Sequence, residues 1–315
     1  MIWRSFLPSA TSQGGGKFRR WARFQKAMTK KKWLEIDRER NGPITLFDFA
    51  LASDAVDAAL VDETSKKGGW RISDDSVMGG FSKATFQLIQ TSQDYKKYMS
   101  GKTIDVPLEE LQIKMEEEAK QDEEEDPFEE DAAGIKDDET PEHESDVSEF
   151  VPFVRWKGTI DTRIPPGTDI QRSGFCAIRS PEFPFGGADL GGRYNGLEIM
   201  CRSDGRYYSL LLNVETMIPD DVYQCFINIP PTIPKEEYIC PETGGKFDKV
   251  VLLFQHFIVT SGGRMRATQR ELDNAVRIES IGLTLMDGID GDFEFDLARI
   301  RAINYDDTGI IGVAD

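Results

Sequence analysis

Histidine is scarce in this chain of 315 residues, which has only His143 and His256. A metal site built from several histidines, including an HExxH zinc site, is therefore excluded by count. A Ser-His-Asp triad would have to use His256, and no serine lies in a GxSxG segment. We expect His256 to be an ordinary strand residue, and we expect no enzymatic activity, no catalytic residues, no metal site and no cofactor.

Long hydrophobic runs and paired cysteines are also missing. No apolar run approaches the roughly 18 residues that a membrane-spanning helix needs. The four cysteines, Cys176, Cys201, Cys225 and Cys240, form no CxxC pair and no tight cluster. In a chain without a secretory signal, such cysteines are typical of reduced, buried thiols that serve packing.

Acidic charge is concentrated in one segment. Residues 105–149 hold 21 Asp and Glu against 3 Lys, which accounts for the whole formal net charge of −18. The rest of the chain has 35 acids and 35 bases, but nine of those bases lie in residues 1–34, which contain no acid. The remaining chain is mildly acidic and would repel phosphate, so no general nucleic-acid binding is expected.

Residues 1–34 have the composition of an organellar targeting segment. They are rich in Arg, Lys, Ser and Thr, and four apolar residues recur at helical spacing: Phe18, Trp21, Phe24 and Met28. A positively charged amphipathic helix of this kind is typical of transit peptides. We favour a mitochondrial destination over a plastid. The alternative without targeting is a basic surface helix that stays on the protein.

One folded domain is expected over residues 35–315, with its folded parts at about 44–104 and 150–305. The acidic insertion 105–149 interrupts it. Beyond about residue 120 the insertion has too few apolar residues to offset its ordering entropy, so we predict that it is disordered. Strand-like sequence resumes directly after it, which favours an inserted loop over a linker between two domains.

Short apolar runs separated by turns dominate the rest of the chain. Residues 46–49 and 81–89 predict two strands, and residues 53–60 predict a short helix. The remaining predicted strands are 153–160, 173–180, 196–203, 207–214, 223–229, 249–259, 278–286 and 293–303. Many short strands with few helices predict an all-β fold, a β-sandwich or jelly roll.

The sequence gives little support to two other kinds of site, a Ca²⁺ site and a sugar-binding site. Asp287, Asp290 and Asp292 lie in one loop, but their spacing is not that of an EF-hand, so a structural Ca²⁺ is the minor interpretation. Trp70 and Trp156 would stack on sugars if exposed on one sheet face, as in a carbohydrate-binding module. Tryptophans of a sandwich are mostly buried, so we expect core positions for both.

The segment WRISDDSVMGG, residues 70–80, resembles the complex I intermediate-associated protein family. The hallmark of that family is a Trp, an Asp and a Met-Gly-Gly-x-Ser run. The corresponding residues are Trp70, Asp74 or Asp75, Met78, Gly79, Gly80 and Ser82. Further segments are similar to the family in the same order: Gly174, Phe175 and Arg179; then Asn195, Gly196 and Leu197; then Asp204, Gly205, Arg206 and Tyr207; and finally residues 281–303.

This resemblance implies a galactose-binding-like jelly roll without a known catalytic role. Mitochondrial members are assembly factors, so it implies complex I assembly intermediates and other assembly factors as partners. It also implies a peripheral position on the matrix side of the inner membrane. A plastid biogenesis factor of the same family, acting in photosystem assembly or linked to RNA, remains an alternative, as does a carbohydrate-binding module. The acidic insertion is not a feature expected of the family.

Family-motif residues are the candidates for partner binding: Trp70, Asp74, Met78, Gly79, Gly80, Ser82, Asp204, Gly205 and Arg206. The alternative is that the glycines fix turns with positive φ and that the aspartates cap them.

Overall fold

The computed structural model describes most of the expected domain. The described residues are 42–60, 69–101, 110–117, 150–164, 166, 173–190, 192, 194–216, 218, 221–232, 247–272, 277–306 and 309–310. The predicted targeting segment 1–34 and the predicted disorder of the insertion beyond residue 120 lie outside them. All described residues except 116–117 belong to one compact unit, residues 41–115 and 136–315. No helix among the described residues is long and apolar enough to cross a membrane.

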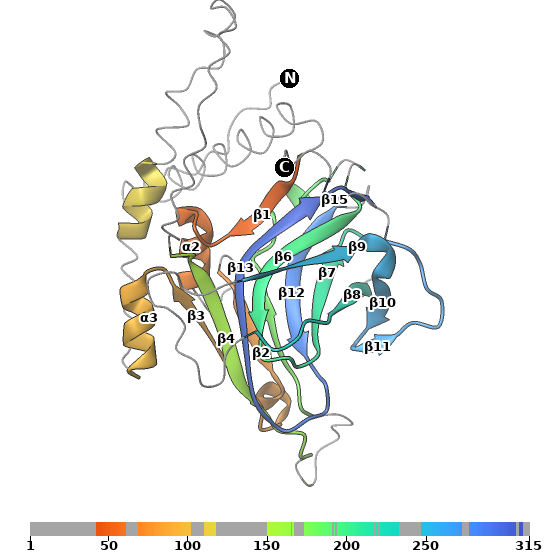
Figure 1. Cartoon of the computed structure of the whole chain (residues 1–315). Coiled ribbons are helices and arrows are strands. Elements are labelled where there is room, and N and C mark those ends of the chain that lie inside the picture. Colours follow the sequence, from red (N-terminus) through yellow and green to blue (C-terminus); the bar gives the residue numbers. More distant parts are fainter. Residues whose placement is uncertain are drawn as a thin grey trace, which may run out of the picture. The chain divides into compact units, whose positions relative to one another are not determined.

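Two sheets form the domain (Figure 1). The first has the order β3-β4-β13-β6-β9, and β1 also pairs with β13. Its strands are β1 (Ile44–Asp48), β3 (Lys83–Ile89), β4 (Phe153–Ile160), β6 (Gly196–Ser203), β9 (Asp248–Leu253) and β13 (Gly291–Ile303). Every pairing in this sheet is antiparallel.

The second sheet has the order β11-β10-β8-β7-β12-β5-β2 and is also antiparallel. Its strands are β2 (Arg71–Asp74), β5 (Cys176–Arg179), β7 (Tyr208–Val214), β8 (Asp221–Ile227), β10 (Ile258–Ser261), β11 (Arg264–Met265) and β12 (Ile278–Leu285). A separate pair joins β14 (Tyr305–Asp306) and β15 (Gly309–Ile310). The chain passes repeatedly from one sheet to the other, which confirms the predicted jelly-roll β-sandwich.

Helical segments are short. They are α2 (Ala52–Ala59), α3 (Ser92–Met99), the residues 110–117, and the 3-10 turns η1 (Asp75–Met78), η2 (Pro184–Gly186) and η3 (Phe254–His256). The predicted helix 53–60 is confirmed with a shift of one residue. Helix α3 was not predicted, although Thr91 and Asp94 form a capping box at its start.

The core fills the space between the sheets with alternate residues of each strand. Phe293, Phe295 and Leu297 are all buried, as their period of two predicts. Trp156 packs edge-on against Phe293, with ring centroids 4.9 Å apart, and also against Tyr208 at 5.8 Å.

The other face of the first sheet carries a buried ion cluster under α3. Asp296 accepts hydrogen bonds from both Arg155 (2.7 and 2.8 Å) and Arg202 (2.7 and 3.0 Å). Aromatic rings lie over both guanidinium groups, with Tyr95 of α3 among those over Arg155 and Phe247 4.2 Å from Arg202. Arg155 also pairs with Glu294 at 2.7 Å, so the buried Asp296 and the partly buried Glu294 together compensate the charge of the two guanidinium groups.

One predicted strand was wrong. The run 249–259 is not a single strand, because η3 divides it into β9 in the first sheet and β10 in the second. Phe254 and Phe257 are both buried at a spacing of three, which a tight turn allows and an alternating strand does not. His256, expected in a strand, is exposed on this turn.

Candidate functional site

Four loops meet at one end of the sandwich, at the lower end in Figure 1. We call this surface the loop end and define it by residues 74–83, 161–164, 204–207 and 286–292. Strands β2, β4, β6 and β12 run toward it, and β3, β7 and β13 lead away from it. Most of the sequence-predicted site residues lie in these loops, although they are far apart in the sequence.

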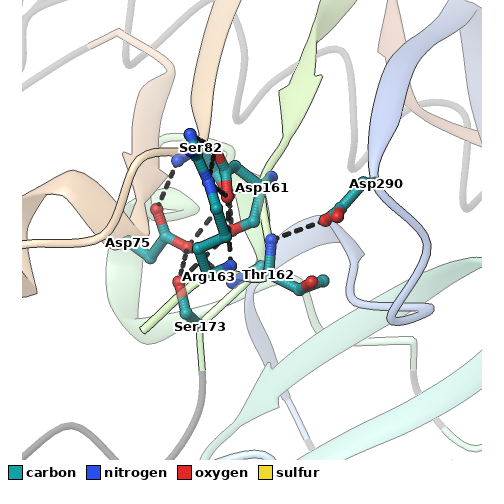
Figure 2. Close-up of polar contacts among 8 residues, drawn as sticks. Asp75, Ser82, Asp161, Thr162, Arg163, Ser173 and Asp290 are labelled. Carbon is teal, nitrogen blue, oxygen red and sulfur yellow. Dashed lines mark hydrogen bonds and ion pairs between the residues drawn. The ribbon is translucent and has the colours of Figure 1, made fainter. Parts of the chain in front are cut away.

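Asp75 is the centre of the hydrogen-bond network at the loop end (Figure 2). Its side chain is fully buried and accepts four hydrogen bonds. One oxygen accepts from the backbone N–H of Ser82 at 2.8 Å. The other accepts from the Ser82 hydroxyl at 2.9 Å, the Ser173 hydroxyl at 2.9 Å and the backbone N–H of Gly174 at 2.6 Å. The carboxylate thereby joins η1, the start of β3 and the start of β5.

These donors also determine the charge state of Asp75. Burial by itself would raise the pKa of the carboxyl, but the hydrogen bonds from Gly174, Ser173 and Ser82 outweigh it and hold the pKa below its usual range. Asp75 is therefore an ionised group with its acceptor positions occupied. Such a carboxylate stabilises the loops and is poorly suited to take up a proton.

The Met-Gly-Gly-x-Ser motif is explained by this network. A Cβ on Gly80 would lie 2.3 to 2.7 Å from the carboxylate atoms of Asp75, so only glycine fits there. Gly79 ends η1 with a φ of 95°, a backbone conformation that favours glycine. Ser82 supplies two of the four donors. Met78 of the same motif contacts solvent, since half of its side chain is exposed.

Asp74, which the sequence analysis placed in the site, has a local role. Its side chain accepts hydrogen bonds from the backbone N–H of Ser76, at 3.1 Å, and from the Ser76 hydroxyl, and it caps η1. The neighbouring Asp75 holds the loops together. The sequence offered both aspartates as matches to the family's Asp, and the contacts favour Asp75.

The network continues from the motif loop to the segment after β4. The backbone N–H of Asp161 donates to the Ser82 hydroxyl at 3.0 Å. One residue further, the N–H of Thr162 donates to Asp290 at 2.6 Å, so the loop before β13 is connected as well (Figure 2). The carboxylate of Asp290 therefore has a structural partner, as in a capped turn.

Arg206 fixes the remaining two loops. Its guanidinium pairs with both oxygens of Asp287, at 2.9 and 2.6 Å, and also donates to the carbonyls of Ile289 and Gly291. Asp204 accepts from the backbone N–H groups of Arg206 (3.0 Å) and Glu294 (2.9 Å). Gly205 lies in the turn between Asp204 and Arg206. The predicted residues 204–206 thus connect β6 and β7 to the loop before β13.

Both candidate tryptophans are core residues. Trp70 and Trp156 are each 1% exposed, and Trp70 stacks on Phe86 with ring centroids 5.3 Å apart. The sugar-stacking alternative required these rings on an exposed face, so it is wrong for these two tryptophans. Trp70 is part of the family motif, and its role in this structure is to pack in the core.

The described residues give little support for a metal site or for a reactive thiol. No group of three or more His, Cys, Asp or Glu among the described residues is placed to hold a metal ion. Cys176, Cys201 and Cys225 are buried and free, and burial raises the pKa of each thiol, to about 12, 12 and 11. Thiols of this kind are inert near neutral pH. Cys240 lies outside the described residues.

Sequence reasoning missed Ser173, Asp161 and the structural role of Asp287. The side chains that meet them come from loops about 80 to 100 residues away. No local pattern marks such a contact. The one available signal was the run of aspartates 287–292, which the sequence analysis weighed only as a Ca²⁺ loop.

Comparison with known proteins finds a family whose sequence model matches part of this chain. The sequence model of the family Complex I intermediate-associated protein 30 (CIA30) matches residues 144–297. This segment includes three of the four loops, while the motif loop 74–83 precedes it.

Similar solved structures include the family 11 carbohydrate-binding module of the cellulosomal cellulase Lic26A-Cel5E of Clostridium thermocellum. It is 12% identical, with a TM-score of 0.40, and the match covers 87% of this chain and 97% of that one. A second structure of a family 11 module from the same organism, in complex with a mixed-linked tetrasaccharide, is 12% identical with a TM-score of 0.38 and covers 84% and 96%. An exo-beta-agarase is 12% identical with a TM-score of 0.34 and covers 84% of this chain and 25% of its own.

The family match agrees with the resemblance carried by residues 70–82 and 174–206. Residues 144–297 of this chain are similar to the complex I intermediate-associated protein 30 family, as the match of its sequence model shows.

Proposed function

We propose that this protein is a non-catalytic assembly factor that binds a membrane-arm intermediate of mitochondrial respiratory complex I. The observation that carries the proposal is the family match over residues 144–297. The name of that family links it to intermediates of complex I, which are incompletely assembled and expose surfaces that the finished complex buries.

The chemistry of the loop end supports a binding role over a catalytic one. Asp75, Asp204 and Asp287 each accept at least two hydrogen bonds within the domain. A general base or nucleophile must instead turn a free lone pair toward a substrate. These carboxylates stabilise a loop structure, which leaves the exposed side chains of the same loops for contact with a partner.

A matrix location on the inner membrane completes the proposal. The basic composition of residues 1–34 favours import into mitochondria, as described above. A rigid sandwich on the matrix side would hold an exposed surface of the intermediate until later subunits compete for it. Release then needs no chemistry, only a partner that binds the same surface more tightly.

The test is deletion of the gene in the native organism. Mitochondrial membranes are separated on native gels, and tagged full-length protein is added back to the deletion strain. We expect the strain to lose mature complex I while its other respiratory complexes remain. The restored protein should migrate with membrane-arm subunits in a band smaller than complex I. Normal complex I in the deletion strain, or migration with plastid proteins, would contradict the proposal.

A further inference from the structure

Large apolar side chains are exposed on all four loops of the loop end. Val77 is 84% exposed, Tyr207 62% and Ile289 55%, and Phe81 and Ile164 are about half exposed. Single exposed apolar residues are ordinary on a protein surface, but a group of them on adjoining loops is typical of a contact surface.

Direct contacts show that these loops adjoin one another. The guanidinium of Arg163 lies over the ring of Phe81, 5.1 Å from its centroid. The neighbouring Thr162 is hydrogen-bonded to the loop before β13, as described above. On the far side of that loop, Arg206 donates to the carbonyl of Ile289, and the next residue is Tyr207. The exposed side chains therefore form one surface.

The backbone beneath this surface is held in place. The N–H of Ile289 donates to Asp287 at 3.1 Å, and its carbonyl accepts from Arg206. The backbone of the motif loop is fixed on Asp75. Since these loops are ordered before any partner arrives, little ordering entropy opposes binding.

Acidic groups surround the apolar side chains. The described residues 74–83, 161–164, 204–207 and 286–292 contain seven aspartates against one Lys and two Arg, a net charge of −4. Asp290 and Asp292 are exposed. An anionic bilayer would be repelled by this charge, whereas a protein segment with Lys and Arg would be attracted.

We infer that the loop end docks on a Lys- and Arg-rich segment that flanks a transmembrane helix of a membrane-inserted subunit. This inference rests on the proposed function. Segments that remain on the insertion side of a membrane carry an excess of Lys and Arg. Their long aliphatic stems and neighbouring apolar residues pack against Val77, Phe81 and Ile289, while their cationic groups reach the exposed carboxylates.

Site-specific photo-crosslinking in the complemented deletion strain tests the inference. A benzophenone amino acid replaces Val77 or Ile289 in the full-length protein. The control position is Ile218, which is 42% exposed and precedes β8 at the opposite end of the second sheet. We expect positions 77 and 289 to crosslink to Lys- or Arg-containing peptides next to transmembrane helices, and position 218 not to do so.

Charge neutralisation supplies the second measurement. The variant Asp74→Asn, Asp290→Asn, Asp292→Asn removes three negative charges and keeps an oxygen acceptor for each hydrogen bond that these side chains accept. Its melting temperature should stay close to that of the wild type, while the yield of crosslinks from position 77 falls about tenfold. The loss should be mimicked in the wild type by raising the salt concentration.

Three results would overturn the inference. They are crosslinks from positions 77 and 289 to lipid or to soluble subunits only, flotation of the purified protein on anionic vesicles that depends on Val77, and undiminished crosslinking of the Asn variant. If complex I is nevertheless lost in the deletion strain, the proposed function stands and only the docking partner is wrong. Normal complex I in that strain contradicts both.

Discussion

Replacing Asp75 by asparagine should destabilise the domain far more than the small change in shape suggests. The two carboxylate oxygens accept from two different backbone N–H groups, those of Ser82 and Gly174. An amide has only one acceptor oxygen, so in either orientation one buried N–H group faces the amide nitrogen. Loss of a charge-assisted hydrogen bond together with an unpaired buried donor costs about 3 kcal/mol. For a domain of this size, that lowers the melting temperature by about 6–12 °C.

Thermal unfolding followed by circular dichroism measures this effect, with Asp74→Asn as the matched control. The control keeps its acceptor and should change the free energy of unfolding by less than about 0.5 kcal/mol. Because the folded pKa of Asp75 is lowered, its contribution is complete above the unfolded pKa near 4 and is lost as the pH falls through the folded pKa. The stability gap between wild type and Asp75→Asn should therefore shrink below about pH 4. Equal stability of the two proteins at pH 7 would refute the reasoning.

Three further substitutions test the packing and charge arguments. Gly80→Ala forces a Cβ against the buried carboxylate described above and should cost about 2 kcal/mol in urea unfolding; an unchanged midpoint would mean that the loop can shift. Arg206→Lys removes the two-point pairing with Asp287 and should lower stability by about 2 kcal/mol, with the loss seen in a thermal melt at pH 7. Asp296→Asn removes the carboxylate that both buried guanidinium groups bind, while Arg155 keeps its ion pair with Glu294, and should cost about 3 kcal/mol, so a soluble protein with wild-type stability would contradict the shared-carboxylate account.

The strands of this fold are readable from the sequence where apolar and polar residues alternate. In β13, the apolar residues Phe293, Phe295 and Leu297 alternate with the acidic residues Glu294 and Asp296, and the predicted strand is confirmed even though Asp296 is also buried. Alternation fails where the chain changes sheets. Between β9 and β10 the only polar interruption is the exposed pair Gln255 and His256, which is too short to separate two strands in a run that is otherwise apolar from Val250 to Val259.

The candidate site, like the strands, could be predicted from the sequence only in part. The motif glycines and Ser82 were placed in the right loop because they are close in sequence. The choice between Asp74 and Asp75 could not be made, since it depends on Ser173 and Gly174, which reach the carboxylate only after β4 and β5 have paired with their neighbours. Burial of a polar group is decided by tertiary contacts that local sequence does not record.

The position of β13 affects how this protein is made. It pairs with β1, β4 and β6 and lies at the centre of the first sheet, yet it begins only at Gly291. All strands of the second sheet precede β13 in the chain, but β1, β4 and β6 of the first sheet cannot be joined until Gly291 and the residues after it have been synthesised. The first sheet therefore closes only after β13 is made, and until then the strand edges that β13 covers stay unpaired and open to aggregation. A truncation before Gly291 should leave a chain that is degraded, regardless of how many loop residues it retains.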